Sequence, residues 1–498
     1  MKKHSLNRRE FLKTTAALGA TAAGLGATAA GLGVTAAFPG HLTASGLPPG
    51  EQKANTPPHI ILVMADDMGW AQTGYYGHPL LKTPHLDEMS RSGLRLDRFY
   101  VAAPSCSPTR ASILTGRSND RTGVFRVGDC INKQEMMLST AFRNAGYRTA
   151  HFGKWHLNAV EAPGDNPMPK SDPHNPGELG FDYWLSATNQ FNIDPVLSRN
   201  GKRERLKGES SEVLVDEALK WIGNQVGSGK PVFTVIWYAS PHRPMEASAE
   251  DAEPFTHLNP ASRDHHGEIV AMDRSIGALR KGLRKLGIAD NTLVWFKSDN
   301  GGLPNIDYGP KHPAIVPDTT GHLRGFKKDF YEGGLRVPSI IEWPRGIQSR
   351  TTRFPTCTMD IFPTLIDVAG LDPKDINPVH DGISIADLFA SEPARRDRPI
   401  GFRASGGLAW IDNDDKLVKN MTWNKDLGAK SGEFEFYNII GDPSETQDLI
   451  KQKPELAARM RKQLDAWNRS VDRSITGADY PEGKVLPSGR KPMKRGKK

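Results

Sequence analysis

The sequence predicts an α/β protein built on a large, mixed and mostly parallel β-sheet flanked by helices, with a small C-terminal α+β subdomain that holds an antiparallel sheet. Three continuous apolar runs, at 59–65, 231–239 and 292–296, are typical of strands buried on both faces of a parallel sheet. Stretches with helical spacing lie between them, at 210–226 and 268–286. After about residue 380, shorter alternating segments typical of antiparallel strands replace this pattern.

Shorter segments complete the predicted order of elements. Helices are expected at 86–93, 139–146 and 360–369, and strands at 147–156 and 337–343. Residues 157–208 are rich in Pro, Gly, Asn and Asp, so we expect a long loop region there, and long loops beside a site shape its pocket. In the C-terminal part, strands are expected at 400–410, 416–421 and 433–439, before a helix at 455–467.

The first 45 residues are typical of an export signal. Arg8 and Arg9 stand in a twin-arginine pattern, and a weakly hydrophobic stretch of Ala, Gly, Thr and Leu follows over 16–38. This stretch is long enough for a transmembrane anchor, but its Gly and Thr content favours a signal peptide that is removed. We therefore expect the twin-arginine translocase to export the folded protein to the bacterial periplasm.

The predicted organisation of the chain is a signal peptide at 1–45, a Pro-rich linker at 46–58, the large α/β domain at 59–380, the C-terminal subdomain at 381–480 and a basic tail at 481–498. The formal net charge of +8 is concentrated at the two ends, because residues 1–13 carry a net +4 and residues 490–498 a net +6. The part between them is close to neutral. A nucleic-acid partner is therefore not expected, since it would need a basic face on the folded domain.

Cys106 is the first candidate for chemistry. It is one of only three cysteines, so neither a full disulfide framework nor a zinc knuckle is expected. Pro104 and Pro108 place it at a bend in polar surroundings, with Arg110 four residues further on. Two interpretations fit these residues: a buried small hydrophobic side chain, or a thiolate nucleophile that the arginine favours.

Acidic and amide side chains follow two of the predicted strands. Asp66 and Asp67 come directly after the first strand, and Asp299 and Asn300 come after the strand at 292–296. Adjacent carboxylates at such a strand end are costly unless something positive binds them. Exposed loop acids or a helix N-cap are the alternative for Asp66 and Asp67. Four oxygen donors from two strand ends are a stronger indication of a metal site than either pair alone, and hard oxygen ligands suit calcium.

Basic side chains also occur close to strand ends. Lys154 and His156 lie at the end of the predicted strand 147–156. His242 follows the predicted strand 231–239 and has a proline on each side. Lys327 and Lys328 precede a Glu-Gly-Gly triplet. In α/β enzymes ligands bind at the carboxyl ends of strands, so Lys154, His156 and His242 are candidates for a binding site. A loop histidine that contacts only backbone is the alternative for His242.

Residues 106–110, Cys-Ser-Pro-Thr-Arg, together with Ala-Ser at 111–112 and Leu-Thr-Gly-Arg at 114–117, resemble the signature of the type I sulfatases, in the alkaline-phosphatase superfamily. Further motifs follow in the order of that family. They are Asp66-Asp67, a K-x-H motif at 154–156, an H-x-P motif at 242–244, Asp299-Asn300 and a second signature over 323–338, whose lysine falls on Lys327.

The resemblance implies that Cys106 is oxidised to Cα-formylglycine (3-oxoalanine) by a formylglycine-generating or sulfatase-maturating enzyme, and that its hydrate is the nucleophile. It implies one bound calcium ion, with magnesium as the alternative. The implied metal ligands are Asp66, Asp67, Cys106, Asp299 and Asn300. The implied substrate is a sulfated carbohydrate or an aryl sulfate.

The same resemblance implies roles for the other motif residues. Arg110 orients the hydrate, while Lys154, Lys327 and His242 hold the sulfate oxygens. His242 or Lys327 protonates the leaving alcohol. His156 then removes a proton from the second hydroxyl, so that sulfate leaves by elimination and the aldehyde is restored.

Two other functions fit the same motifs. A phosphodiester or phosphonate monoester hydrolase of the same superfamily can share the nucleophile and the single-metal site. A catalytically inactive sulfated-glycan-binding protein is the alternative from a different functional class, and it would have an unmodified cysteine or lack a metal ligand. The motif positions named above are all occupied by the residues that the family requires, which favours the sulfatase.

Overall fold

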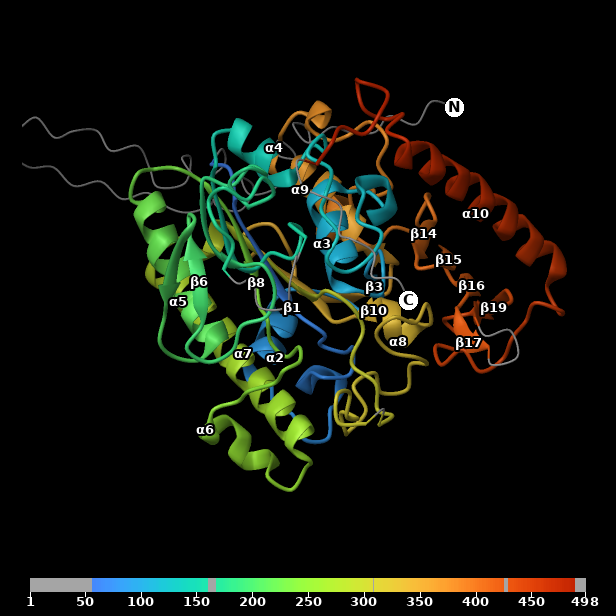
Figure 1. The fold of residues 1–498 in the computed structure, drawn as a ribbon, viewed down its shortest axis with the longest axis horizontal. Helices are drawn as coiled ribbons and strands as arrows, with labels where there is room; N and C mark the ends of the chain where they lie inside the picture. Colours follow the sequence, from blue (N-terminus) through green and yellow to red (C-terminus); the bar gives the residue numbers. More distant parts are fainter. Residues whose placement is uncertain (1–55, 160–166, 308, 425–428, 489–498) are drawn as a thin grey trace, which may run out of the picture. The chain divides into compact units, whose positions relative to one another are not determined.

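The apolar run His59–Ala65 forms β1, near the centre of a ten-stranded sheet in the computed structural model (Figure 1). Its neighbours are β8 (Val232–Trp237) and β9 (Thr292–Ser298), and both pair with it in parallel. β4 (Arg148–Lys154) pairs in parallel with β8. The strand order is β12-β2-β11-β9-β1-β8-β4-β5-β6-β7, so the expected mixed, mostly parallel sheet is confirmed.

The structure describes residues 56–159, 167–307, 309–424 and 429–488, and only the backbone of 422–424 and 429–431. The predicted signal peptide, most of the linker and residues 489–498 of the basic tail lie outside this part of the chain. Among the described residues, every helix is too short or too polar to cross a membrane.

The outer strands are short. On one side of the sheet they are β5 (Tyr183–Ala187), β6 (Val196–Arg199) and β7 (Lys202–Arg205), and on the other β11 (Ser339–Glu342), β2 (Leu94–Leu96) and β12 (Arg350–Thr352). The prediction of a loop region at 157–208 is therefore wrong for β5, β6 and β7. β7 is mostly exposed and β6 half-buried, so neither shows the apolar pattern of a core strand.

Two helical layers cover the two faces of the sheet. Successive side chains of β1 point to opposite faces, so Ile61 and Val63 pack in one apolar cluster and Ile60 and Leu62 in the other. The first cluster contains side chains of α2 (Pro84–Ser92), α5 (Ser210–Val226) and α7 (Pro260–Lys285). The second contains those of α3 (Cys106–Thr115), α4 (Leu138–Asn144) and α9 (Ile361–Ala369). Figure 1 shows α5 and α7 on one side of the sheet and α3 and α9 on the other.

α7 begins at Pro260, eight residues before the predicted start. The Asn259 side chain caps it by accepting a hydrogen bond from the Ser262 backbone N–H at 2.9 Å. The two helical turns before the predicted start contain the buried residues His265 and His266, and no apolar spacing in the sequence indicates these turns. The short helix α6 (Ala249–Ala252) precedes it.

The C-terminal part contains its own antiparallel sheet, as expected. Its strands are β14 (Ile400–Ala404), β15 (Gly407–Asp412), β16 (Asp415–Lys419) and β19 (Glu435–Asn438), and a hairpin of β17 (Thr422–Asn424) and β18 (Ala429–Ser431) lies between β16 and β19 in the chain. The helix α10 (Pro454–Ile475) packs on this sheet through Met460 and Leu464 and runs eight residues past its predicted end. The boundary at residue 380 stays a prediction.

A third, small sheet lies close to the start of α3. It consists of β10 (Arg336–Val337), β3 (Phe99–Tyr100) and β13 (Thr356–Cys357). The short helix α8 (Glu332–Leu335) leads into β10. β3 precedes the loop that leads to Cys106, the first residue of α3.

A buried ion network joins the C-terminal sheet to α8. The Nζ atom of Lys416 lies 3.1 Å from Glu332 Oε1 and 2.8 Å from Glu445 Oε1. The side chains of Lys416 and both glutamates have no exposed surface, and the Tyr100 hydroxyl donates to Glu332 Oε2 at 3.0 Å. Burial raises the pKa of Glu445 to about 7, which the Lys416 charge opposes. The lysine is therefore the cation that makes two buried carboxyl groups tolerable.

Replacing Lys416 by Met should lower the free energy of unfolding by about 3–5 kcal/mol, because it leaves buried Glu445 without a cation and Glu332 with only the longer contact to Arg336 Nη1, at 3.8 Å. Lys451→Met is the matched control, since Lys451 is exposed. Urea unfolding followed by circular dichroism compares the two variants. Equal midpoints for both variants would show that the network does not hold the two parts together.

Candidate active site

The carboxyl ends of β1 and β9 bring four polar side chains together. Asp66 and Asp67 follow β1, Asp299 and Asn300 follow β9, and all four are fully buried. The Asp67 backbone N–H donates to Asp299 Oδ1 at 3.1 Å, and Asn300 Nδ2 donates to Asp67 Oδ1 at 2.8 Å. Parallel neighbouring strands end at the same edge of a sheet, so the predicted pairing of the two motifs follows directly from the topology.

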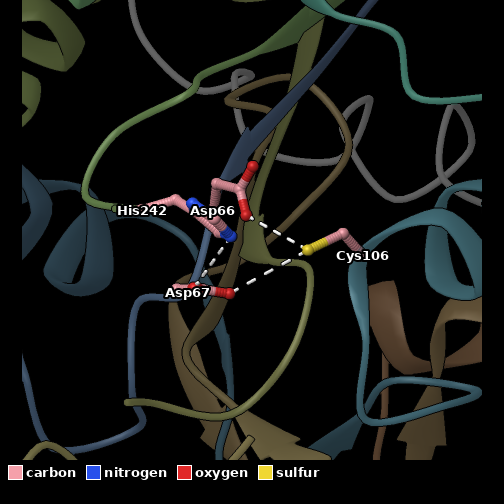
Figure 2. A group of neighbouring side chains, drawn as sticks. All are labelled: Asp66, Asp67, Cys106 and His242. Carbon is pink, nitrogen blue, oxygen red and sulfur yellow. Dashed lines mark hydrogen bonds and ion pairs between the residues drawn. The ribbon is translucent and has the colours of Figure 1, made fainter. Parts of the chain in front are cut away.

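Cys106 faces this group from the first residue of α3. Its Sγ lies 3.4 Å from Asp66 Oδ1 and 3.4 Å from Asn300 Oδ1, and Figure 2 shows it opposite Asp66, Asp67 and His242. Burial and the charges of Asp299 and Asp66 raise the pKa of the Cys106 thiol well above its usual value. The unmodified side chain is therefore a neutral thiol, and the thiolate nucleophile considered from the sequence is disfavoured.

Arg110 lies one helical turn after Cys106 and is fully buried. Its Nη2 lies 2.9 Å from Asp299 Oδ2 and 3.1 Å from Asp66 Oδ2, and its Nη1 donates to the Lys154 carbonyl at 2.7 Å. The helical spacing alone suggested a contact between Arg110 and the thiol, but the structure shows none. Arg110 instead joins α3 to residues at the ends of β1, β4 and β9. Burial and the Asp66 charge raise the pKa of Asp299 to about 7, although Arg110 opposes the shift.

Lys154 is the last residue of β4, and its Nζ lies 2.5 Å from Asp66 Oδ2. The strand therefore ends two residues earlier than predicted. His156 has a left-handed backbone, with φ of 59°, and is buried. Burial and the Lys154 charge lower the pKa of His156 well below its usual value, so its imidazole is neutral. Its Nδ1 has no hydrogen-bond partner among the described residues.

His242 and Lys327 approach Asp67 from two loops. His242 Nε2 lies 3.5 Å from Asp67 Oδ2, and its Nδ1 donates to the Arg243 carbonyl at 2.5 Å. Burial lowers the pKa of His242 to about 4, against the opposing Asp67 charge. Lys327 Nζ lies 2.5 Å from Asp67 Oδ1 and 3.5 Å from Cys106 Sγ, whereas Lys328 is exposed. The lysine that the second signature indicated is thus the one in the cluster.

The cluster offers ligands of two kinds. Carboxylate oxygens of Asp66 and Asp67, the Cys106 sulfur and a His242 ring nitrogen all lie within 4.8 Å of one another, a spacing that can hold a metal ion. Asp67 Oδ2 is buried and makes no hydrogen bond among the described residues, so one oxygen is free to coordinate. Buried ammonium groups stand beside these oxygens and can bind an anion.

Sequence reasoning missed a supporting network behind His242. His265 of α7 contacts the carbonyl of Pro241 through Nδ1 at 3.0 Å and Gln72 Nε2 through Nε2 at 2.8 Å. Gln72 in turn accepts from the Gly69 backbone N–H at 2.9 Å. The network joins the segment after β1 to the segment that carries His242. Only the position of His265 in α7 reveals it, and that turn of the helix was not predicted.

A parallel sheet whose strand ends hold a buried metal-type cluster beside cationic side chains is typical of enzymes with an alkaline-phosphatase-like fold. The family model described as Sulfatase matches residues 58–371. N-acetylgalactosamine-6-sulfatase of Canis lupus familiaris is 29% identical over 461 residues, which cover 83% of this chain and 81% of the relative. Ulvan-active sulfatase of Formosa agariphila is 27% identical over 480 residues, or 88% of each chain.

A solved structure, that of Ps i-CgsB in complex with k-i-k-neocarrahexaose, has a TM-score of 0.71 and 26% identity, and covers 83% of this chain and 93% of that one. The chain therefore belongs to the sulfatase family, and it is an enzyme that hydrolyses sulfate esters. A twin-arginine translocation signal matches residues 5–26, so the protein is exported across the cytoplasmic membrane to the periplasm.

Gly153, in β4, is a position where the backbone leaves no room for a side chain. It has a φ of +97°, and a Cβ atom there would lie 2.0 Å from the Trp237 carbonyl oxygen of β8. Gly153→Ala should therefore displace the end of the strand that carries Lys154. Gly146→Ala is the matched control, because Gly146 has a φ of +86° but open space around it.

Both glycine variants suffer the cost of a left-handed alanine, and only Gly153→Ala adds a steric clash. We expect Gly153→Ala to be about 1–3 kcal/mol less stable than Gly146→Ala in urea unfolding, with a larger loss of sulfatase activity. Equal stability and activity of the two variants would contradict this packing argument.

Proposed function

We propose that this sulfatase acts on a sulfated carbohydrate or an aryl sulfate and uses a formylglycine made from Cys106 together with one bound divalent cation. The observation that carries the proposal is the position of residue 106, whose sulfur is within 3.5 Å of Asp66, Asn300 and Lys327. The names of the relatives point to carbohydrate sulfates. A thiol held neutral by burial is a poor nucleophile, and its conversion to an aldehyde gives the position a function.

The cation is proposed to bind the oxygens at the two strand ends. Asp66, Asp67, Asp299 and Asn300 supply oxygen donors, and the modified side chain at 106 completes the set. Oxygen ligands of this kind suit calcium, with magnesium as the alternative. When bound, the ion would act as a Lewis acid that favours the ionised form of a hydroxyl group at position 106.

The hydrated formylglycine would supply two hydroxyl groups, one to attack sulfur and one through which sulfate is released. Asp299, whose pKa burial raises, is suited to accept the proton of the first. His156 is neutral and has a free Nδ1, so it is suited to accept the proton of the second. Arg110 keeps Asp299 and Asp66 in place for these steps.

Lys154 and Lys327 are proposed to bind the oxygens of the sulfate group. Lys154 Nζ lies 2.5 Å from Asp66 Oδ2, and Lys327 Nζ lies 2.5 Å from Asp67 Oδ1, both close to residue 106. Charge-assisted hydrogen bonds from them would stabilise negative charge as it develops on sulfate. Lys327 is also placed to protonate the departing alcohol, because the charge of Asp67 raises its pKa against the effect of burial and keeps it protonated. His242 lies at the open side of the cluster, with its side chain 23% exposed, but its ring is neutral and its Nδ1 donates to the Arg243 carbonyl, so its Nε2 can only accept a proton.

The direct test of this function is sulfate release by protein made in a host that oxidises sulfatase cysteines. The panel compares an aryl sulfate, sulfated sugars and a phosphonate monoester with otherwise similar leaving groups. We expect turnover of sulfate esters at least about 100-fold above that of the phosphonate, since the site is proposed to be tuned to sulfate. The reverse preference would establish the phosphonate hydrolase instead.

Cys106→Ala should abolish turnover, to below about one-thousandth of the wild-type rate, because the nucleophile is lost. The substitution removes one buried sulfur atom, so the fold should persist and the circular dichroism spectrum should stay unchanged. Cys357→Ala is the control, since Cys357 is also a buried free cysteine but lies outside the cluster. A Cys106→Ala protein that still releases sulfate would refute the assignment.

Removal of divalent cations should lower the melting temperature, and added calcium should restore it, because a ligand that binds only the folded state stabilises it by about 2.7 kcal/mol at one hundred times its Kd. Thermal unfolding of chelator-treated protein against calcium or magnesium separates the two ions. Asp67→Asn should weaken the response, whereas Asp129→Asn, outside the cluster, should not. No response to either ion would exclude the cation site.

A further inference from the structure

Arg243 is the x residue of the H-x-P motif, and its ionic surroundings set it apart. It is half-buried, and no carboxylate of the described residues lies within ion-pair distance of it. Each of the other described arginines that are not fully exposed has such a partner, as Arg110, Arg280 and Arg396 illustrate. An arginine that is partly withdrawn from water without a counter-ion is costly to keep, which points to a ligand that supplies the charge.

Among the described residues, the guanidinium of Arg243 contacts one backbone carbonyl and one histidine ring. Its Nη2 donates to the Pro313 carbonyl at 2.6 Å, and its Nη1 lies 3.3 Å from His312 Nδ1. Its Nε is buried and has no hydrogen-bond partner among the described residues. A guanidinium has five N–H donors in a fixed fork that matches the oxygens of a carboxylate or a sulfate, and most of these donors are uncommitted here.

Arg243 lies close both to the active site and to the surface. It follows His242, whose Nε2 lies 3.5 Å from Asp67. Burial lowers the pKa of Arg243, and the charge of Asp67 opposes this shift. Its guanidinium, however, turns to residues 312–313, where His312 is exposed and Pro313 half-buried. The arginine therefore lies between the reacting centre and the solvent, where the remainder of a bound substrate would extend.

We propose that Arg243, with His312 beside it, binds a second anionic group of the substrate, a carboxylate or a further sulfate on the sugar that carries or adjoins the scissile sulfate ester. This inference rests on the proposed function and adds to it a class of substrate, namely polyanionic carbohydrates. The scissile sulfate has ammonium groups of its own, since Lys154 and Lys327 stand beside Cys106 and its carboxylates. Arg243 is thus available for a different anion.

The test measures kcat/KM for three matched disaccharides: one with a single sulfate, one that adds a uronate carboxylate and one that adds a second sulfate. In the wild-type enzyme the doubly charged substrates should be preferred. Arg243→Gln should reduce that preference by about 10- to 100-fold, mainly through KM, because a charge-assisted hydrogen bond made to the bound substrate is lost. The substrate that loses most identifies the second anion as carboxylate or sulfate.

Two further variants serve as a partial rescue and as a control. Arg243→Lys retains the charge without the fork and should recover part of the preference. Arg284→Gln removes the same charge from an exposed position near the end of α7 and should leave the preference within about twofold of the wild-type value, since exposed charges act weakly at a distance.

An equal loss on all three substrates would overturn the proposal, because it would place Arg243 at the scissile sulfate or in the fold. An unchanged preference in Arg243→Gln would overturn it as well. Failure of the underlying function looks different: the wild-type enzyme would then release sulfate from none of the three substrates.

Discussion

The ion pairs of Arg110 with Asp66 and Asp299 are the interaction on which the rest of the site depends. None of the three side chains is exposed to solvent. Carboxylates buried so close together would repel one another and lose their hydration, so a cation between them is a condition for the two strand ends to meet. Because Arg110 lies one helical turn after Cys106, the same ion pairs also determine where residue 106 stands relative to the acids.

The site balances two opposite requirements with one set of residues. Its carboxylates suit a cation, and its ammonium groups, which now pair with those carboxylates, suit an anion. Burial keeps His156 and His242 neutral by lowering the pKa of both, so their ring nitrogens can accept a proton, whereas the charged lysines cannot. Charged side chains hold the substrate, neutral ones accept protons, and burial separates the two roles.

The features that sequence could predict are those with a strong local pattern. The runs that form β1, β8 and β9 are continuously apolar and end in polar motifs, so the sheet and the edge that carries the site follow from them. The choice of Lys327 over Lys328 followed from a motif, and the structure brings that lysine to Asp67. The first turns of α7 and the hairpin of β6 and β7 escaped prediction although each has a local signal. These signals are the Asn259 cap before Pro260 and the Asn200-Gly201 turn, where φ is 51° and 93°. The network of His265 and Gln72 joins residues far apart in the sequence, so it is visible only in the folded chain.

The central claim is that residue 106 works as an aldehyde beside a cluster of oxygens, and mass analysis of the peptide that contains it tests this most directly. The protein is made in a host with the oxidising enzyme, and its specific activity is measured. The mass of the tryptic peptide Phe99–Arg110 is then determined by mass spectrometry. If the aldehyde is the working group, the fraction of peptide with formylglycine at position 106 rises in proportion to specific activity across preparations. Fully active protein that carries only an unmodified cysteine at this position would contradict the claim.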